Sequence, residues 1–228
     1  MSITINGQLL LAMLAEKLTK AGAQVIMANT DGLECIISKV DYDAIIKICE
    51  EWESLTNLTL EYETYRKMFV ANVNNYCAIT TSGKLKQKGA FEVNKWINKD
   101  HSKRVVPIAV QEYVQNGTPV EVTIRNHDKV EDFFVFVRCK KTSMLCHELD
   151  GEDSPLQRIN RLIVSKSGVP MYKRFTDGRK IGVYVGNLLS DFNLITDEKL
   201  EDVEINYDYY IKEANKLIQS VESFNDLF

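Results

Sequence analysis

Residues 23–37, AQVIMANTDGLECII, constrain the fold more than any other stretch of the sequence. Two apolar runs, residues 25–27 and 33–37, flank an Asn-Thr-Asp-Gly segment. Asp-Gly between two such runs is a strong signal for a β-hairpin. The hairpin would carry one carboxylate, Asp31, at its tip. Asp31 either serves only the turn, whose geometry Asp tolerates well, or supplies an exposed and rigidly held metal ligand.

Length and composition narrow the class of protein. The chain has 228 residues, of which 45% are hydrophobic and 26% charged, as in ordinary soluble globular proteins. No apolar run approaches the roughly 18 residues that span a bilayer, and the first residues lack the basic region of a signal peptide. The five cysteines form no close CxxC pair, which favours reduced thiols. We therefore expect a cytoplasmic protein with no membrane partner.

The charge is distributed unevenly along the chain. The overall net charge of −4 divides into −4 for residues 1–60, +7 for residues 61–180 and −7 for residues 181–228. A basic middle between acidic ends suits a protein that binds a polyanion with one region. A solvated surface with uneven charge would give the same numbers, so both interpretations stay open.

The pattern of apolar residues predicts an α+β fold in the first part of the chain. Helical spacing in residues 7–21 and 41–54 predicts an amphipathic helix before the hairpin and another after it. Strand-like runs follow at residues 58–65, 67–73, 76–81 and 85–91. This order predicts an antiparallel sheet with helices on one face.

After about residue 100 the pattern changes to a mixture of helices and β-hairpins. Hydrophilic residues 94–103 separate these two patterns of predicted elements. We therefore expect one domain over residues 1–98 and a second over residues 99–228. The second domain is predicted to contain helices at 103–116 and 207–223, a short element at 119–124, and strands at 133–140, 162–174 and 182–185.

Three lysines alternate in the last strand-like run of the first domain. On a strand, Lys84, Lys86 and Lys88 would share one face. Their charges repel one another, so this arrangement suits an anion such as a nucleic-acid backbone lying across it. The alternative is an exposed edge strand that lysines protect from aggregation.

Taken in order, these stretches resemble the palm of family B DNA polymerases, particularly the bacteriophage branch. Residues 29–32 resemble the family's motif C, usually Tyr-Gly-Asp-Thr-Asp-Ser. Residues 74–76 resemble the position of its Lys-Lys-Arg-Tyr motif, which holds the primer strand. Residues 157–168 and 209–214 resemble the thumb of the phage enzymes. The resemblance covers nearly the whole chain and rests on the order and spacing of the motifs.

The resemblance implies a DNA-directed DNA polymerase fragment, with residues 1–98 as part of the palm and 99–228 as the thumb. Asp31 takes the position of the second Asp of motif C, which implies a Mg²⁺ ligand in two-metal nucleotidyl transfer, supported by Asn29 and Thr30. The implied partners are a DNA primer-template and deoxynucleoside triphosphates. The residues implied to contact DNA are Asn75, Tyr76, Lys84, Lys86, Lys88, Lys103, Arg104, Arg161 and Lys166.

The chain departs from the family's motifs at several positions. Only Thr30 and Asp31 match motif C, because Asn29 is neutral where the family has an acid and Gly32 replaces Ser. The lysines of Lys-Lys-Arg-Tyr are absent, so phosphate contacts would fall to the lysines of residues 84–88.

Two motifs are missing from the sequence altogether. Neither motif A, Asp-x-x-Ser-Leu-Tyr-Pro-Ser, nor motif B, Lys-x-x-x-Asn-Ser-x-Tyr-Gly, occurs. Two-metal transfer needs carboxylates for both ions, and Asp31 is one. Glu34 is an odd number of residues further on, so strand alternation predicts it on the opposite face.

Three hypotheses follow. The chain is half of a split polymerase that acts with a separate N-terminal chain carrying motifs A and B. Alternatively, it is a non-catalytic DNA-binding protein derived from a polymerase fragment, or an inactive remnant.

Overall fold

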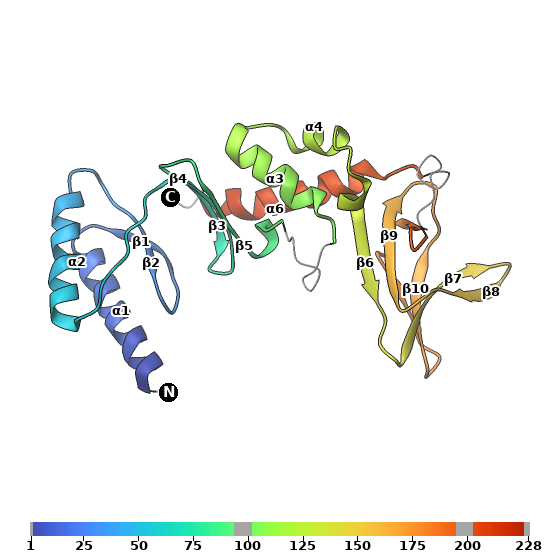
Figure 1. Ribbon diagram of the computed structural model, residues 1–228, viewed down its shortest axis with the longest axis horizontal. Helices are drawn as coiled ribbons and strands as arrows, with labels where there is room; N and C mark the ends of the chain where they lie inside the picture. Colours follow the sequence, from blue (N-terminus) through green and yellow to red (C-terminus); the bar gives the residue numbers. More distant parts are fainter. Residues whose placement is uncertain (1, 94–101, 195–202, 226–228) are drawn as a thin grey trace. The chain divides into compact units, whose positions relative to one another are not determined.

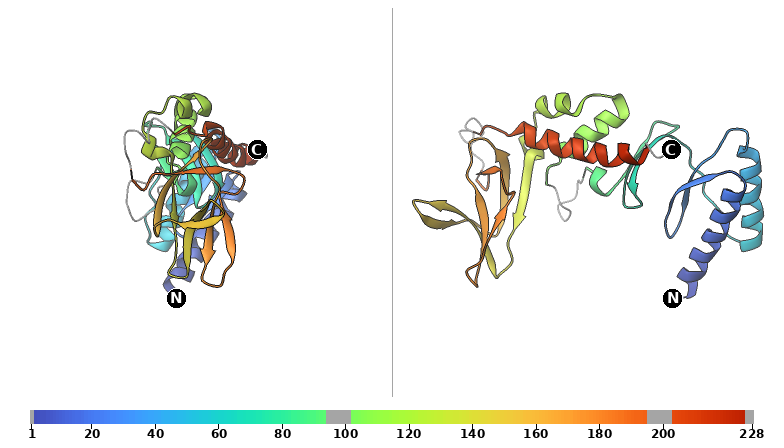
Figure 2. Two further views of the ribbon diagram at one scale, coloured as in Figure 1. Left: turned by 90° about the vertical axis from the view of Figure 1, so that its right-hand side faces the viewer. Right: turned by 180° about the vertical axis from the view of Figure 1, so that it is seen from behind.

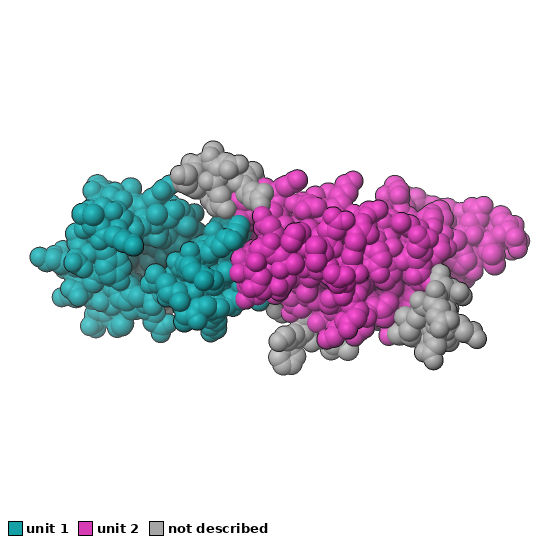
Figure 3. All heavy atoms as spheres, turned by 90° about the horizontal axis from the view of Figure 1, so that it is seen from above, with its two compact units in different colours: residues 1–88 teal, residues 89–228 magenta. Residues whose placement is uncertain are grey.

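The computed structural model describes residues 2–93, 102–194 and 203–225 (Figure 1). The chain forms two compact units, Met1–Lys88 and Gly89–Phe228 (Figure 3). Both units combine helices with antiparallel sheets, which confirms the α+β class. The boundary expected between residues 98 and 99 lies outside the described residues, and the two units divide between Lys88 and Gly89.

The first unit contains two helices, a two-stranded hairpin and a three-stranded sheet. Its elements are α1 (Ser2–Lys20), β1 (Gln24–Ala28), β2 (Leu33–Ile36), α2 (Tyr42–Thr56), β3 (Tyr65–Asn72), β4 (Asn75–Thr80) and β5 (Leu85–Lys88). The hairpin and α2 lie where the sequence predicts them, because each follows from local spacing and turn signals. Helix α1 was predicted from residue 7 but begins at Ser2.

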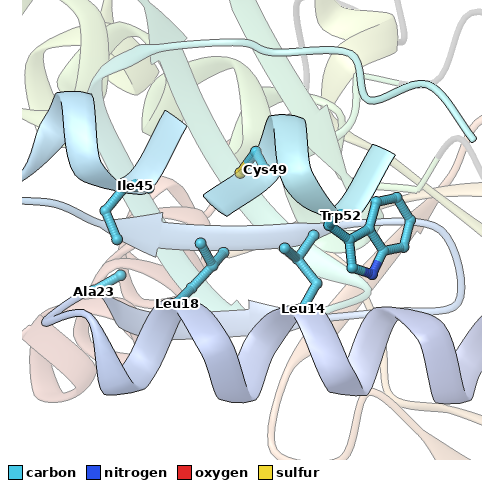
Figure 4. Close-up of a cluster of buried hydrophobic side chains, with 6 residues drawn as sticks. All are labelled: Leu14, Leu18, Ala23, Ile45, Cys49 and Trp52. Carbon is cyan, nitrogen blue, oxygen red and sulfur yellow. The ribbon is translucent and has the colours of Figure 1, made fainter. Parts of the chain in front are cut away.

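Helices α1 and α2 pack together over one face of the β1–β2 hairpin. Their shared core is a cluster of buried side chains (Figure 4), to which alternate residues of the hairpin, Leu33 and Cys35, add their side chains. The indole N–H of Trp52 donates to the carbonyl of Leu10 at 2.9 Å, which ties α2 to α1. The buried members of the cluster are Leu14, Leu18, Ala23, Ile45, Cys49 and Trp52. The hairpin is therefore held from one side, and its tip stays exposed.

The three-stranded sheet has the order β3-β4-β5 and is antiparallel throughout. The strand predicted over residues 58–65 is wrong except for Tyr65, where β3 begins. The physical reason is the lack of a partner, because β4 ends at Thr80, which is paired with Tyr65. The last backbone contact on this side is the carbonyl of Thr64, which accepts from the N–H of Thr81 at 3.0 Å, and a strand that continued before Thr64 would find no ladder for its backbone groups.

The described residues of the second unit form three α-helices and two antiparallel sheets, which Figure 2 shows from two further sides. The helical elements are η1 (Gly89–Phe91), α3 (Val105–Asn116), α4 (Val120–Arg125), η2 (Val130–Phe133) and α6 (Tyr207–Asn225). The strands are β6 (Phe134–Arg138), β7 (Ser143–Leu149), β8 (Glu152–Pro155), β9 (Ile159–Ser165), β10 (Met171–Phe175), β11 (Lys180–Val183) and β12 (Leu188–Asp191). Their sheet orders are β12-β9-β6 and β11-β10-β7-β8.

The single strand predicted over residues 162–174 is two strands in two different sheets. β9 pairs with β6 and β12, whereas β10 pairs with β7 and β11. The chain changes sheet at Gly168, where an added Cβ would lie 2.3 Å from the carbonyl oxygen of Leu189. Only a residue without a side chain fits so close to another backbone.

Helix α6 is fixed to the second unit by Tyr210, whose side chain is fully buried. Its hydroxyl donates to the carbonyl of Phe133 at 2.6 Å and accepts from the backbone N–H of Val164 at 3.1 Å. Its ring meets that of Phe133 edge to face, with centroids 5.2 Å apart. One side chain therefore joins α6 to η2 and to the central strand β9.

The four-stranded sheet of the second unit, β11-β10-β7-β8, is held together by Asp153 of β8. Its carboxylate accepts hydrogen bonds from Lys180 at 2.7 Å, from the Tyr172 hydroxyl, and from Arg174 at 3.0 Å. These contacts, that of Lys180 foremost, lower the pKa of Asp153 to about 2 from its ordinary value of 3.8. A carboxyl whose pKa is lowered in the folded state stabilises the fold at pH values above its ordinary pKa of 3.8. This stabilisation is lost as the pH falls to about 2.

We therefore expect Asp153→Asn to lower the urea midpoint of unfolding at pH 7 and to have a much smaller effect near pH 2. Unfolding followed by circular dichroism at both pH values measures this difference. Glu152→Gln, on the same strand and exposed, is the control and should leave both midpoints unchanged. An equal loss at both pH values for Asp153→Asn would show that the ion pairs are not the source of the stabilisation.

Candidate functional site

The tip of the β1–β2 hairpin holds Asp31 in a four-residue loop, residues 29–32. The loop is closed by the backbone N–H of Asn29, which donates to the carbonyl of Gly32 at 3.0 Å. The Asn29 side chain accepts from the backbone N–H of Asp31 at 2.8 Å, and the Thr30 hydroxyl donates to the Asp31 carboxylate at 2.9 Å. These three contacts fix the loop and leave the Asp31 carboxylate exposed. Asn29 and Thr30 thus position Asp31 directly.

This loop can supply one ligand to a divalent cation. Mg²⁺ takes oxygen ligands and is commonly held by one or two protein carboxylates together with substrate phosphates. Asp31 fits that requirement for one carboxylate. Across residues 2–93, 102–194 and 203–225, no three His, Cys, Asp or Glu side chains gather at one place.

Glu34 lies on β2, three residues beyond Asp31, and faces a different environment. Strand alternation does not relate Glu34 to Asp31, because Asp31 lies in the loop and not on a strand. The prediction that Glu34 faces away from Asp31 on that ground is therefore wrong. Burial raises the pKa of the Glu34 carboxyl, the charge of Lys86 opposes this rise, and the carboxylate of Glu63 adds to it. Glu34 therefore belongs electrostatically with Glu63 and Lys86 of the same unit.

The lysines of residues 84–88 lie on one face of the three-stranded sheet. Lys86 pairs in register with Ala78 and Lys88 with Tyr76, so both ammonium groups share a face with the Tyr76 ring. Lys84 precedes β5, but its backbone continues the ladder, because its carbonyl accepts from the backbone N–H of Thr80 at 2.9 Å. We call Lys84, Lys86, Lys88 and Tyr76 the lysine face. Lys84 and Lys88 are exposed.

Lys86 is not available in the way the sequence suggests, because Glu63 forms an ion pair with it. The Glu63 carboxylate also accepts from the Tyr65 hydroxyl at 2.9 Å, and the Lys86 ammonium lies 5.9 Å from the centroid of the Tyr65 ring. The hydrogen bond with Lys86 lowers the pKa of Glu63 and raises that of Lys86. Sequence reasoning missed Glu63, since only the β-bulge between Tyr65 and Lys67 brings this segment to the lysine face.

Asn75 lies at the start of β4, beside the turn that joins β3 to β4. Its side-chain amide donates to the Asn72 side-chain oxygen at 3.0 Å, and the backbone N–H of Asn74 donates to the same oxygen at 3.0 Å. The structure thus brings Asn75 and Tyr76 onto the strand next to β5, but Asn75 takes part in the turn itself.

The four residues singled out in the second unit make contacts within the chain. The Lys103 ammonium donates to Glu213 at 2.8 Å, Arg104 pairs with the buried Asp132 at 3.0 Å, and Lys166 lies 3.5 Å from Glu204. The Arg161 guanidinium donates to the backbone carbonyl of Asn193 at 3.2 Å. Lys103 and Arg104 are therefore parts of structural ion pairs that position the start of α3.

No protein-family model and no curated protein match the sequence. Among solved structures, the chain is similar to the family B DNA polymerase from the hyperthermophilic archaeon Pyrobaculum calidifontis. The TM-score is 0.50 and the sequence identity 14%, and the match covers 96% of this chain. The fold is polymerase-like. The chain spans 29% of the length of that polymerase, so the likeness concerns part of a larger enzyme.

The described part of the chain contains no helix that is both long and apolar enough to cross a membrane. All five cysteines are described, and none is in a disulfide.

Proposed function

We propose that this chain is a palm and thumb portion of a family B DNA polymerase of the bacteriophage type. Residues 1–98 would belong to the palm and residues 99–228 to the thumb. The observation that carries the proposal is the polymerase-like fold over 96% of the chain, in which the residue matching motif C, Asp31, sits exposed at a hairpin tip.

Within this proposal Asp31 binds Mg²⁺, with Asn29 and Thr30 holding the loop. Two-metal transfer places two ions about 3.5–4 Å apart between the attacking and leaving oxygens. One exposed carboxylate does not hold both ions, so the second carboxylate and the triphosphate site come from residues outside this sequence. We propose that a separate N-terminal polymerase chain with motifs A and B supplies them, and that a DNA primer-template and deoxynucleoside triphosphates are the substrates.

Primer extension tests the proposal. The 228-residue chain is first assayed alone with Mg²⁺, primer-template and nucleotides. It is then assayed after mixing with a second polypeptide that carries motifs A and B. We expect synthesis only in the mixture. DNA binding without synthesis in either assay would favour the non-catalytic DNA-binding protein, for which the neutral Asn29 at an acidic position already argues. Neither binding nor synthesis would favour a remnant.

The lysine face is the DNA-contacting surface that we propose for the first unit. Its ammonium groups contact phosphates, so binding is independent of sequence and weakens as the salt concentration rises. Asn75, Lys103, Arg104, Arg161 and Lys166 remain proposed contacts, but each must first give up or share a contact described above. Lys84 and Lys88 need no such rearrangement, because neither forms an ion pair within the described residues.

We expect Glu63→Gln to strengthen DNA binding, because the substitution releases the Lys86 ammonium and removes a negative charge. An exposed ion pair contributes little, so the gain in affinity should be small, at most about 5-fold. The plot of log K against log salt should steepen by about 0.9 if Lys86 then contacts one more phosphate. Fluorescence anisotropy with a labelled primer-template at several salt concentrations measures both quantities.

The matched control for Glu63→Gln is Glu61→Gln, which removes the same charge two residues away from an exposed position. It should leave the salt slope unchanged. Adding Lys86→Ala to Glu63→Gln should return the slope to that of the native chain. Equal effects of Glu61→Gln and Glu63→Gln would mean that only net charge matters and that Glu63 does not control Lys86.

A further inference from the structure

The inner sheet of the second unit, β12-β9-β6, has one face covered and the other partly open. The covered face carries Val135 and Val137 of β6 and Leu162 and Val164 of β9, all of them buried. Side chains alternate along a strand, so Phe136 and Arg138 of β6 belong to the other face. That second face is closed at one end only, where Phe134, Ile163 and Phe192 form a small core.

At the open end of this face, two apolar and two basic side chains alternate along and across the strands. Phe136 is directly opposite Arg161, and Arg138 is directly opposite Ile159, in the register of β6 with β9. The two strands lie side by side in both Figure 1 and Figure 2. Directly opposed residues have Cβ atoms about 4.5–5.5 Å apart, so the four side chains form one continuous patch. Phe136 is 37% exposed and Ile159 52% exposed.

The charge of this patch is entirely positive. It holds two guanidinium groups and no carboxylate, and neither Arg138 nor Arg161 forms an ion pair with any residue in the described ranges. Arg161 is fixed in place, because its guanidinium and its backbone N–H both donate to Asn193. The carbonyl of Arg138 accepts from the Lys173 ammonium at 3.1 Å, which brings a further positive charge to the same edge.

An exposed aromatic ring beside two guanidinium groups, neither of which is in an ion pair with a described residue, suits a particular kind of ligand. Unpaired nucleobases stack on aromatic side chains, and their phosphates need positive charge alongside. The bases of a duplex are already stacked on one another and do not offer their faces to Phe136. An acidic peptide would satisfy the arginines but offers no base to stack on the exposed Phe136 ring, which meets the Phe134 ring edge to face with centroids 6.4 Å apart.

We propose that Phe136, Arg138, Ile159 and Arg161 form a binding surface for a single strand of nucleic acid. A base stacks on Phe136 and Ile159, while Arg138 and Arg161 contact the flanking phosphates. This site shares Arg161 with the DNA contacts proposed above, but it goes beyond the proposed polymerase function, because it binds unpaired bases and does not depend on Asp31 or Mg²⁺.

Fluorescence anisotropy of the full 228-residue chain tests the surface with three labelled probes: a 20-nucleotide oligothymidylate, a 20-nucleotide oligouridylate and a 20-base-pair blunt duplex. We expect Phe136→Ala to weaken single-strand binding by about 5- to 150-fold, the range for loss of one stacked base. Duplex binding should stay unchanged. Phe136→Trp should restore single-strand affinity, because the larger ring keeps the stacking face.

Val122→Ala is the control, since Val122 is an exposed apolar residue of the same unit and lies outside the patch. It should change none of the three affinities. Arg138→Gln should reduce the salt dependence of single-strand binding by about 0.7, the value for one phosphate contact on a single strand. Tighter binding of the thymidylate or of the uridylate identifies DNA or RNA as the strand.

Two results would overturn the proposed surface. One is an unchanged single-strand affinity for Phe136→Ala, and the other is an equal loss on the duplex. Neither result bears on the polymerase proposal, which depends on primer extension and on duplex binding by the lysine face. Circular dichroism of each variant checks that it is folded. We expect the Phe136 variants to fold, because the Phe136 side chain is exposed.

Discussion

Asp31→Asn is expected to abolish nucleotide addition by the complemented enzyme. A metal ion contributes several kcal/mol to the transition state of phosphoryl transfer, and about 4 kcal/mol corresponds to roughly 1000-fold in rate. Asparagine keeps one side-chain oxygen and so preserves the contact from the Thr30 hydroxyl, but it loses the negative charge that the cation requires. Single-nucleotide incorporation under single-turnover conditions measures the loss.

The fold should tolerate this substitution. The loop is closed by Asn29 and Gly32, and the Asp31 backbone N–H is held by the Asn29 side chain, so neither contact involves the Asp31 carboxylate. Asp43→Asn removes an equal charge from the exposed first turn of α2 and serves as the control, with full activity expected. Near-native incorporation by Asp31→Asn would remove Asp31 from the mechanism and leave the turn as its only role.

The hairpin that carries Asp31 could be predicted from sequence because its causes are local. Asp-Gly lies between two apolar runs, and alternate residues such as Leu33 and Cys35 give the hairpin its buried face. The tip is therefore exposed whatever the rest of the chain does. The detail that sequence did not predict is the four-residue loop, in which neither Asp31 nor Gly32 adopts a positive φ.

Contacts between distant segments could not be predicted in the same way. Lys86 meets Glu63 because a bulge in β3 shifts the register of the sheet, and no pattern in the sequence marks that bulge. Lys103 meets Glu213 because α6 packs beside the start of α3, far along the chain. A count of basic residues treats all of them as free, whereas several are already neutralised within the fold.

The β7–β8 hairpin was missed for a different reason. β7 reads SMLCHEL and β8 reads EDSP, so neither shows a clear apolar alternation. Asp153 of β8 holds the hairpin in place, because its carboxylate accepts from Tyr172 and Arg174 of β10 and from Lys180 of β11. Polar side chains that pair across a sheet resemble loop residues when the sequence is read alone.

The largest effect on stability is expected at Tyr210. Replacing Tyr210 with Ala removes a fully buried ring and should cost about 3–5 kcal/mol, the range for loss of a large aromatic core residue. Domains are stable by only about 5–15 kcal/mol, so the second unit would lose a large share of its stability. Urea unfolding followed by near-ultraviolet circular dichroism measures the change.

Tyr210→Phe separates the hydroxyl from the ring. The substitution keeps the edge-to-face contact with Phe133 but deprives the carbonyl of Phe133 and the N–H of Val164 of their partner. A buried polar group left without its partner costs about 1–3 kcal/mol, so we expect an intermediate loss for Phe. Tyr207→Phe is the control, because the Tyr207 ring also meets Phe133, and its hydroxyl forms no hydrogen bond with the described residues.

The comparison of these three variants decides how α6 is held. If Tyr210→Phe unfolds at the same urea concentration as Tyr207→Phe, the two hydrogen bonds contribute nothing and packing alone positions the helix. If Tyr210→Phe falls clearly below it, the helix is also fixed in register by the hydroxyl. In that case loss of the hydroxyl also disturbs β9, because Val164 lies on the strand that carries Arg161. Single-strand binding by Tyr210→Phe should then weaken, while duplex binding by the first unit stays constant.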